Sequence, residues 1–155
     1  MTFEERVRSV RPEPLSAVGV EILQVSLGYR CNMTCKHCHV GGGPVRSEMM
    51  DPDTLETVLE ALSEQGIGTV DITGGAPELN PNFRRLVIES RKMGRRVIMR
   101  TNLTVFFEEG MDYLPRFYDE HSVEIIASLP YYTETKVDRV RGGGAFGRNT
   151  EKVLQ

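Results

Sequence analysis

The sequence predicts an α/β fold in which parallel strands alternate with helices, either as a barrel or as an open sheet. Short runs rich in branched apolar residues have the length and composition of buried strands. Between them lie longer segments whose apolar residues recur at helical spacing, with N-terminal caps and closing glycines. The connections are short, and strands and helices joined in this way form parallel strands with right-handed crossovers.

The first strand is predicted at residues 20–27, where a run of branched residues ends at Gly28 and suits a largely buried strand. The first helix is predicted to begin at Asp51 and Pro52, because aspartate is a favourable N-cap and proline fits the first helical position. Gly66 is predicted to close this helix. Its apolar residues recur at helical spacing and are Leu55, Val58, Leu59 and Leu62.

The second strand is predicted at residues 69–73, and the glycine-rich segment 74–78 follows it. A second cap-plus-proline pair, Asn80 and Pro81, predicts the start of the second helix, and Gly94 predicts its end. The inner face of this helix is expected to carry Phe83, Leu86 and Val87.

The third strand is predicted at residues 97–99 and leads into Thr101 and Asn102. A weaker helical pattern follows, and Pro115 interrupts it. The fourth strand is predicted at residues 123–129, a run that has the composition of a buried strand. The apolar residues of the weaker helix are Leu114, Phe117 and Tyr118.

Two regions are distinguished along the chain. Residues 1–18 contain prolines and no periodicity, and they predict an irregular leader that lies against the domain. Residues 19–155 predict the N-terminal part of a core domain that continues beyond the chain, because Asn149 and Thr150 suit a helix start and the sequence stops within that helix. We therefore expect the chain to be part of a longer enzyme.

The charge of the chain excludes several classes of partner. A formal net charge of -3 provides no basic field for nucleic acid or for an anionic membrane, so a small-molecule substrate is the better expectation. Residues 1–8 are charged throughout and lack the apolar stretch of a signal peptide. The sequence thus predicts a cytoplasmic protein, a compartment in which free cysteines stay available to metals.

All three cysteines of the chain, Cys31, Cys35 and Cys38, fall within eight consecutive positions. Thiolates gathered in one segment indicate ligands of one inorganic centre rather than a disulfide framework. A four-iron cluster held by three thiolates has one iron open to a cofactor or substrate. The alternative is a small zinc site of the Cys3His type, completed by His37 or His39.

The residues that suit chemistry follow the ends of the four predicted strands. The segment 31–38 follows the first strand, Gly74 and Gly75 the second, Asn102 the third and Ser128 the fourth. In parallel barrels the active site forms from the loops at the carboxyl ends of the strands, so these residues are expected to converge. The alternative is structural, because glycine pairs also form tight turns and Asn or Ser also caps strand ends.

Two arginines lie next to a glycine run near the end of the chain. Arg139 and Arg141 could bind a carboxylate or another anion through the fork of guanidinium donors. Arginines in such a setting are more often solvated, and this is our interpretation of both.

The spacing Cys-x3-Cys-x2-Cys resembles that of the radical S-adenosylmethionine (SAM) enzymes. The resemblance implies a partial (β/α) TIM-like barrel, truncated here after about four strands. It also implies that Cys31, Cys35 and Cys38 ligate a [4Fe-4S] cluster whose free iron chelates SAM. An electron from an external donor such as flavodoxin or ferredoxin would then cleave SAM to a 5'-deoxyadenosyl radical.

The same resemblance assigns roles around SAM. His37 occupies a place where the family usually has an aromatic residue near the adenine. The segment Gly74, Gly75 and Ala76 resembles the one that holds the SAM amino group. In the family, glutamate usually follows the two glycines directly, whereas here Ala76 and Pro77 precede Glu78, which leaves the role of this glutamate open. Asn102 and Ser128 stand where family members often meet the SAM carboxylate or ribose.

The segments 29–32, 38–40, 48–50, 73–80, 102–104 and 137–139 together resemble those of one branch, the arsenosugar-biosynthesis type of radical SAM protein. That branch implies transfer of the 5'-deoxyadenosyl group to methylated trivalent arsenic. Two departures are Thr101 and Tyr131, which stand at positions that are often cysteine in the branch. The alternatives are a radical SAM maturase acting on a peptide and a non-catalytic zinc-binding module.

Overall fold

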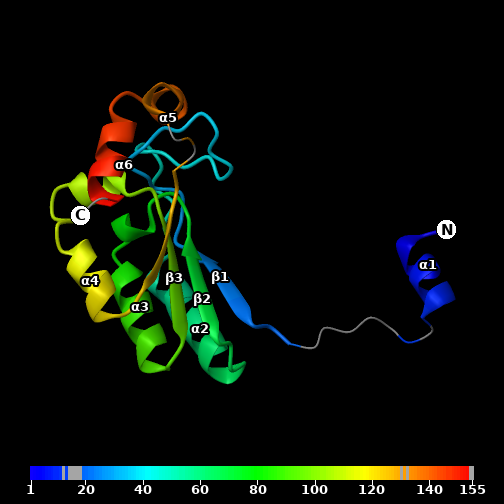
Figure 1. The fold of residues 1–155 in the computed structure, drawn as a ribbon. Helices are drawn as coiled ribbons and strands as arrows, with labels where there is room; N and C mark the ends of the chain where they lie inside the picture. The colour runs from blue at the N-terminus through cyan, green and yellow to red at the C-terminus, as the bar shows by residue number, and fades with distance from the viewer. Residues whose placement is uncertain (12, 14–18, 130, 132, 154–155) are drawn as a thin grey trace.

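A computed structural model describes residues 1–11, 13, 19–129, 131 and 133–153 of the chain. Its centre is a four-stranded parallel sheet with the strands in chain order, and the sheet is not closed (Figure 1). The predicted α/β class is therefore confirmed, as an open section of a barrel-like arrangement. The strands are β1 (Ile22–Ser26), β2 (Thr69–Thr73), β3 (Arg96–Thr101) and β4 (Glu124–Ala127).

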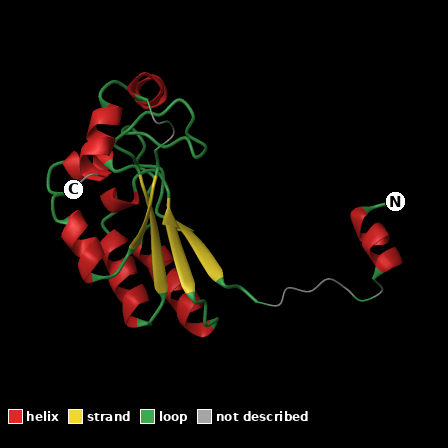
Figure 2. Cartoon of the chain, in the orientation of Figure 1, coloured by secondary structure: helices red, strands yellow, loops and turns green. Residues whose placement is uncertain are grey.

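Three helices connect the strands and cover one side of the sheet (Figure 2). They are α2 (Pro52–Glu64), α3 (Phe83–Lys92) and α4 (Leu114–Glu120). Parallel pairing in register puts alternate residues of neighbouring strands on the same face. One face of the sheet is therefore apolar and packs against the helices, and its fully buried members are Val70, Ile72, Val97 and Met99.

The first crossover helix begins and ends where the sequence predicts. The carboxylate of Asp51 accepts a hydrogen bond from the Thr54 N–H at 2.8 Å, and Pro52 is the first helical residue. Gly66 follows the helix with a positive φ of 62°, which glycine adopts without steric cost.

The second crossover helix begins later than predicted. A 3₁₀ turn, η1 (Pro77–Leu79), precedes it, and α3 starts at Phe83 rather than after Asn80. The prediction was wrong because the amide of Asn80 is used elsewhere. It donates to the backbone oxygens of Leu27 and Met50, at 2.9 and 3.1 Å, and so ties the first strand to the following loop.

The third crossover helix is better formed than expected, because Pro115 lies in its first turn and interrupts nothing. A proline there removes an N–H that has no helical partner in any case. The three apolar residues predicted to face the core, Leu114, Phe117 and Tyr118, are all buried. A second 3₁₀ turn, η2 (Thr104–Phe107), lies between β3 and this helix.

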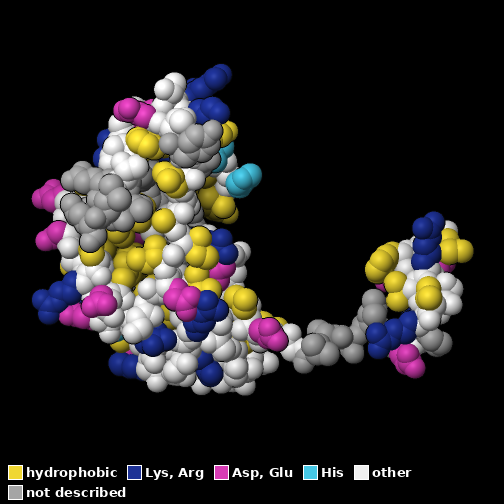
Figure 3. All heavy atoms as spheres, viewed as in Figure 1, with side chains coloured by type: hydrophobic (Ala, Val, Ile, Leu, Met, Phe, Trp, Pro, Cys, Tyr) yellow, Lys and Arg dark blue, Asp and Glu magenta, His cyan; other side chains and the backbone are white. Residues whose placement is uncertain are grey.

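The two outer strands are more exposed than the sequence suggested. In β1 only Val25 is buried, and all four residues of β4 are exposed, with Ile125 and Ile126 each at 43%. The prediction of buried strands was wrong here, because β1 and β4 are the edges of the open sheet and only the inner strands are paired on both sides. Figure 3 shows hydrophobic side chains reaching the surface on the middle of the viewed face.

The N-terminal segment is not irregular throughout. It contains α1 (Phe3–Val10), whose start carries a capping box in which Thr2 and Glu5 satisfy each other's backbone N–H groups. Figure 1 draws this helix apart from the sheet, and none of its residues is buried. No helix of the described residues is both long and apolar enough to span a bilayer.

Two further helices, α5 (Glu134–Arg141) and α6 (Ala145–Val153), follow the fourth strand. The predicted helix start at Asn149 was wrong, because that residue lies inside α6. The signal that was missed is Asp138, whose carboxylate accepts from the N–H groups of Gly144 and Phe146 at 2.7 and 2.9 Å. These bonds hold the pKa of Asp138 below its ordinary value and fix the start of α6.

Candidate functional site

A cavity of about 280 Å³ opens at the carboxyl ends of the strands, next to the cysteine segment and α5. Its wall contains residues from all four strand ends, so the segments predicted to converge lie together. Of the nine side chains and backbone positions predicted for the site, eight line this cavity: Cys31, Cys35, His37, Cys38, Gly74, Gly75, Asn102 and Ser128. The ninth, Ala76, is buried behind the wall and does not line it.

The cysteine segment is held by backbone hydrogen bonds to the glycine-rich loop that follows it. The Tyr29 N–H donates to the Glu48 oxygen at 2.9 Å, and the Gly43 N–H donates to the Tyr29 oxygen at 3.0 Å. The Cys31 N–H donates in turn to the Gly43 oxygen at 3.2 Å. The loop therefore wraps around the cysteines, and its backbone hydrogen bonds fix the position of Cys31.

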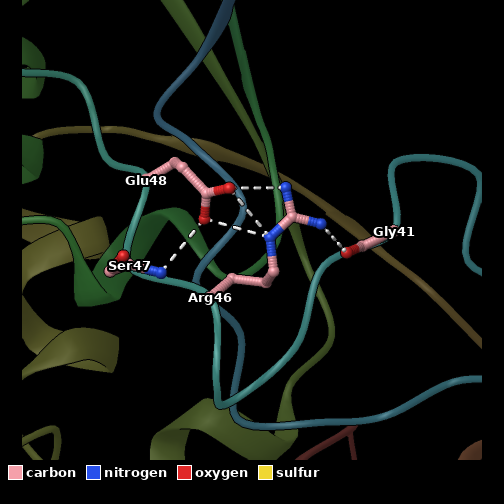
Figure 4. A network of polar contacts seen from close by, with 4 residues as sticks. All are labelled: Gly41, Arg46, Ser47 and Glu48. Atoms are coloured by element: carbon pink, nitrogen blue, oxygen red, sulfur yellow. Dashed lines mark hydrogen bonds and ion pairs between the residues drawn. The ribbon is translucent and has the colours of Figure 1, made fainter.

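A side-chain clasp closes the same loop (Figure 4). The guanidinium of Arg46 binds the carboxylate of Glu48 through two nitrogens, at 2.7 to 3.1 Å, and donates to the Gly41 oxygen at 3.0 Å. The hydrogen bonds from Arg46 lower the pKa of Glu48 to about 2. Arg46 also lies over the ring of Tyr29, 4.8 Å from its centroid, so one side chain connects both arms of the loop.

The glycine pair supports the cysteine segment from below. The Gly75 N–H donates to the Gly28 oxygen at 2.9 Å, and the Ala76 N–H donates to the Arg30 oxygen at 2.8 Å. A Cβ atom on Gly75 would collide with the Arg30 oxygen and would come within 2.8 Å of the Tyr29 oxygen. The two glycines are therefore required for close backbone packing, and Ala76 acts in the same contact.

The three thiols differ in burial. Cys31 is buried, whereas Cys35 and Cys38 are half-buried, and all three are free. Burial raises the pKa values of Cys31 and Cys35, and in Cys35 the positive charge of Arg141 opposes this effect. Sulfur of Cys38 accepts a hydrogen bond from the Gly42 N–H at 3.4 Å. The thiols thus face one cavity and lose their protons more readily once a metal binds them.

Arg141 is a site residue that the sequence interpretation missed. It was expected to be solvated, but it is only 7% exposed and lines the cavity, whereas Arg139 is exposed as expected. One of its terminal nitrogens donates to the backbone oxygen of Asn102 at 3.5 Å, and its buried Nε has no hydrogen-bond partner. Burial lowers the pKa of Arg141, and the neighbouring cysteine thiols oppose that shift.

The position of Arg141 follows from α5. Val137 and Arg141 are four residues apart and are the buried residues of this helix, so they share its inner face. The Lys36 N–H donates to the Val140 oxygen at 3.0 Å and fastens the helix to the cysteine segment. The helical spacing of a valine and an arginine was the signal available in the sequence.

Asn102 lies between the cysteine segment and the third strand. Its amide nitrogen donates to the sulfur of Cys31 at 3.7 Å and to Oδ1 of Asn32 at 2.9 Å. Ser128 is exposed on the cavity wall, and its backbone N–H donates to the Thr101 oxygen at 2.9 Å. His37 is exposed at the rim.

Glu78 does not line the cavity. It is 3% exposed, and its Oε1 accepts a hydrogen bond from the Tyr118 hydroxyl at 3.0 Å, while Oε2 has no partner. Burial raises the pKa of this carboxyl group. Glu78 therefore belongs to the packing between η1 and α4, which answers the question that the displaced glutamate had left open.

A polar group on the open face of the sheet was also missed. Arg100 lines the cavity and binds the carboxylate of Asp71 through Nε and Nη2, each at 2.8 Å, and Gln24 donates to the same carboxylate at 3.0 Å. The bond from Arg100 lowers the pKa of Asp71. The signal was the occurrence of polar residues at alternate positions within strands that otherwise suit burial.

The two metal groups predicted for the three thiols, a zinc ion and a four-iron cluster, differ in the arrangement of ligands that they need. Within the described residues, no three Cys, His, Asp or Glu side chains converge closely enough to hold one metal ion. A four-iron cluster makes a different demand, because each thiolate binds a separate iron and the sulfurs stand farther apart. Three thiols around one cavity, with a buried cation beside them, fit that larger group.

Curated relatives match parts of the chain. The antilisterial bacteriocin subtilosin biosynthesis protein AlbA of Bacillus subtilis is 26% identical over 143 residues, which is 92% of this chain and 30% of that protein. A probable GTP 3',8-cyclase of Sulfurisphaera tokodaii is 32% identical over 85 residues, 54% of this chain and 27% of that protein. The chain thus spans less than a third of the length of these relatives, and neither is an arsenosugar-type protein.

Solved structures share the fold. The structure of anSMEcpe with bound AdoMet superposes with a TM-score of 0.69 at 19% identity, covering 88% of this chain and 40% of that one. Streptococcus suis SuiB superposes with a TM-score of 0.68 at 16% identity, covering 86% of this chain and 29% of that one. Residues 25–144, most of the chain, match the family model described as the radical SAM superfamily. With the three cysteines of the expected spacing at the carboxyl ends of a parallel sheet, the chain belongs to the radical SAM superfamily.

Proposed function

We propose that this chain holds a [4Fe-4S] cluster and SAM in the cavity at the carboxyl ends of its strands, for the reductive cleavage of SAM. Radical SAM enzymes use both groups. The observation that carries the proposal is the meeting of three thiols and a buried arginine with an unpaired nitrogen in one cavity. The chemistry that a bound cluster supplies is one-electron reduction of the SAM sulfonium, which gives methionine and a 5'-deoxyadenosyl radical.

Cys31, Cys35 and Cys38 are the residues that would hold the cluster, and a fourth iron would be open to SAM. Arg141 would bind the SAM carboxylate, because its buried Nε–H is without a partner and guanidinium pairs well with carboxylate. The wall formed by Gly74 and Gly75 has no side chain, so a ligand can approach its backbone. His37 at the rim would lie against the adenine.

The test is anaerobic reconstitution of the protein with iron and sulfide, followed by metal analysis and electron paramagnetic resonance (EPR). The wild-type chain is expected to hold about four irons. After one-electron reduction with dithionite it should give an EPR signal that changes when SAM is added. Replacing Cys31, Cys35 or Cys38 by serine should abolish the signal, while Met33→Leu in the same segment should leave it. Zinc at full occupancy in the wild type, or a cluster that survives these serine substitutions, would refute the proposal.

For the substrate, we propose a peptide in place of the arsenic compound that the sequence resemblance had implied. The support is the match to AlbA, which extends over 92% of this chain, whereas the cyclase match covers 54%. The test is incubation of the cluster-loaded protein with SAM, a reductant and a peptide library, with mass spectrometry of the peptides. Flavodoxin or ferredoxin is the electron donor that we expect, and dithionite can replace it in this assay.

The arsenic reaction is the second candidate, and it rests on the segment 73–80. Trivalent arsenic prefers soft sulfur ligands, and the only three thiols of the chain are the proposed cluster ligands. Further thiol ligands for arsenic would have to come from outside these 155 residues. A methylated trivalent arsenic compound that gains a 5'-deoxyadenosyl group in the same assay, with all peptides unchanged, would reverse the ranking.

A further inference from the structure

We propose that Asn102 is a positioning residue for the cluster rather than a ligand of SAM. In this role its amide N–H donates to the thiolate of Cys31 and raises the reduction potential of the cluster. The proposal rests on the function proposed above. It departs from the expectation that Asn102 meets the SAM carboxylate or ribose.

The hydrogen bonds of Asn102 leave no capacity for SAM. Its amide nitrogen has two N–H groups, and these point to the sulfur of Cys31 at 3.7 Å and to Oδ1 of Asn32 at 2.9 Å. Its amide oxygen accepts two bonds, from the Thr104 hydroxyl at 3.0 Å and the Val105 N–H at 3.1 Å. Every donor and acceptor position of the side chain is therefore occupied within the protein.

Asn32 and Thr104 fix the direction of this amide. The Nδ2 of Asn32 donates to the Thr104 hydroxyl at 3.1 Å and to a carboxylate oxygen of Glu108 at 3.0 Å. Asn32, Asn102 and Thr104 thus form a closed ring of hydrogen bonds in which each orients the next. A rotated Asn102 amide would place its oxygen against sulfur and would break two bonds of the ring.

The contact with Cys31 favours the thiolate over the thiol. A neutral thiol can also donate to Oδ1 of Asn32, at 3.9 Å, but a metal-bound thiolate has no proton to give. The N–H of Asn102 then becomes the side-chain donor to this buried sulfur. Hydrogen bonds to cluster sulfurs stabilise negative charge, and the reduced cluster carries more of it than the oxidised one. The donor should consequently make reduction easier.

The experiment is an EPR-monitored redox titration of the cluster in the reconstituted chain. Asn102→Ala removes the donor and is expected to make reduction about tenfold less favourable, which corresponds to a midpoint about 59 mV more negative for one electron. Asn102→Asp keeps both acceptor contacts, to Thr104 and Val105, but replaces the donor by a negative charge. It should have the lowest potential of the three proteins.

The matched control is Asn82→Ala, which removes an amide that donates to the Met50 oxygen at 3.0 Å and is not part of the cavity wall. It should keep the wild-type potential. A wild-type potential in cluster-loaded Asn102→Ala or Asn102→Asp would overturn the inference and leave the proposed function intact. Failure of both variants to hold iron, with unchanged circular dichroism, would mean that Asn102 serves cluster retention and that the inference is wrong. A wild-type chain without a cluster would instead refute the proposed function.

Discussion

Glycines at the two ends of the sheet differ in how closely other backbone atoms pack against them. At the carboxyl ends, Gly28, Gly74 and Gly75 lie against backbone atoms so closely that an added Cβ would collide with them. At the amino ends, Gly66 and Gly94 have open space around them and serve only a positive φ. The first set fixes the distance between two loops, and the second set ends helices. A glycine in this fold therefore indicates the site only where its backbone packs directly against the backbone of another loop.

Charged side chains at the two ends of the sheet also differ, in their burial and in whether their polar atoms are paired. At the amino ends, Arg96 binds Glu124 through two bonds of 2.5 Å, and both side chains are exposed. At the carboxyl ends, Arg141 and Glu78 are buried and each has a polar atom without a partner. Buried unpaired polar atoms cost stability, and the one in Arg141 faces the cavity, where a ligand can pair with it. Four predictions test this contrast.

The largest effect is expected from Gly75→Ala. Its Cβ would collide with the Arg30 oxygen, and the loops can separate only by breaking the Gly75 and Ala76 hydrogen bonds. We expect the free energy of unfolding to fall by about 1–3 kcal/mol, measured by urea denaturation. Gly43→Ala is the control, because Gly43 has no atom within 4 Å of its Cβ position. Equal losses in the two variants would contradict the packing argument.

The next effect concerns binding rather than stability. Arg141→Leu should weaken SAM binding to the cluster-loaded protein by about 10- to 100-fold, because one charge-assisted contact is lost. Its thermal stability should not fall, since the variant removes a buried charge with an unpaired nitrogen. Calorimetric titration with SAM measures the affinity, and a melting curve measures the thermal stability. Arg139→Leu, which changes an exposed arginine on the same helix, should leave both unchanged.

A third test uses the pH dependence of Glu78. Its folded pKa is raised above the ordinary carboxyl value of 4.5, so the stability linked to its protonation is complete below that value and is lost as the pH rises. Glu78→Gln does not titrate. The melting temperature of this variant should match that of the wild type at about pH 4. At about pH 8 it should be higher, by about 2–4 °C for each kcal/mol of stability that the wild type loses when Glu78 ionises. Glu60→Gln on the exposed face of α2 is the control, and a difference that shrinks with rising pH would refute the assignment.

The smallest effect is expected at the amino ends. Arg96→Ala breaks the exposed pair with Glu124, and pairs of this kind are screened by water and salt. The melting temperature should change by no more than about 1 °C, in low or high salt. A loss as large as that of Gly75→Ala would remove the contrast between the two ends.

The sequence predicted local features well where one residue has one dominant use. Asp51 with Pro52 marked a helix start, and the cysteine spacing marked the site. It failed where a side chain had a distant partner. Asn80 reads as a helix cap, yet its amide joins Leu27 and Met50, which lie 53 and 30 residues away along the chain. Arg141 reads as solvated because its burial depends on how α5 packs on the cysteine segment.

The sequence by itself determined the alternation of the four strands with the three crossover helices and the position of the three thiols, because periodicity, caps and cysteine spacing are local properties of the chain. The tertiary structure decided which polar groups are buried around those thiols. Asn102 and Cys31 are 71 residues apart, and only the pairing of parallel strands brings the amide within 3.7 Å of the sulfur. Contacts of this length depend on packing between elements, and the pattern within any one element does not contain them.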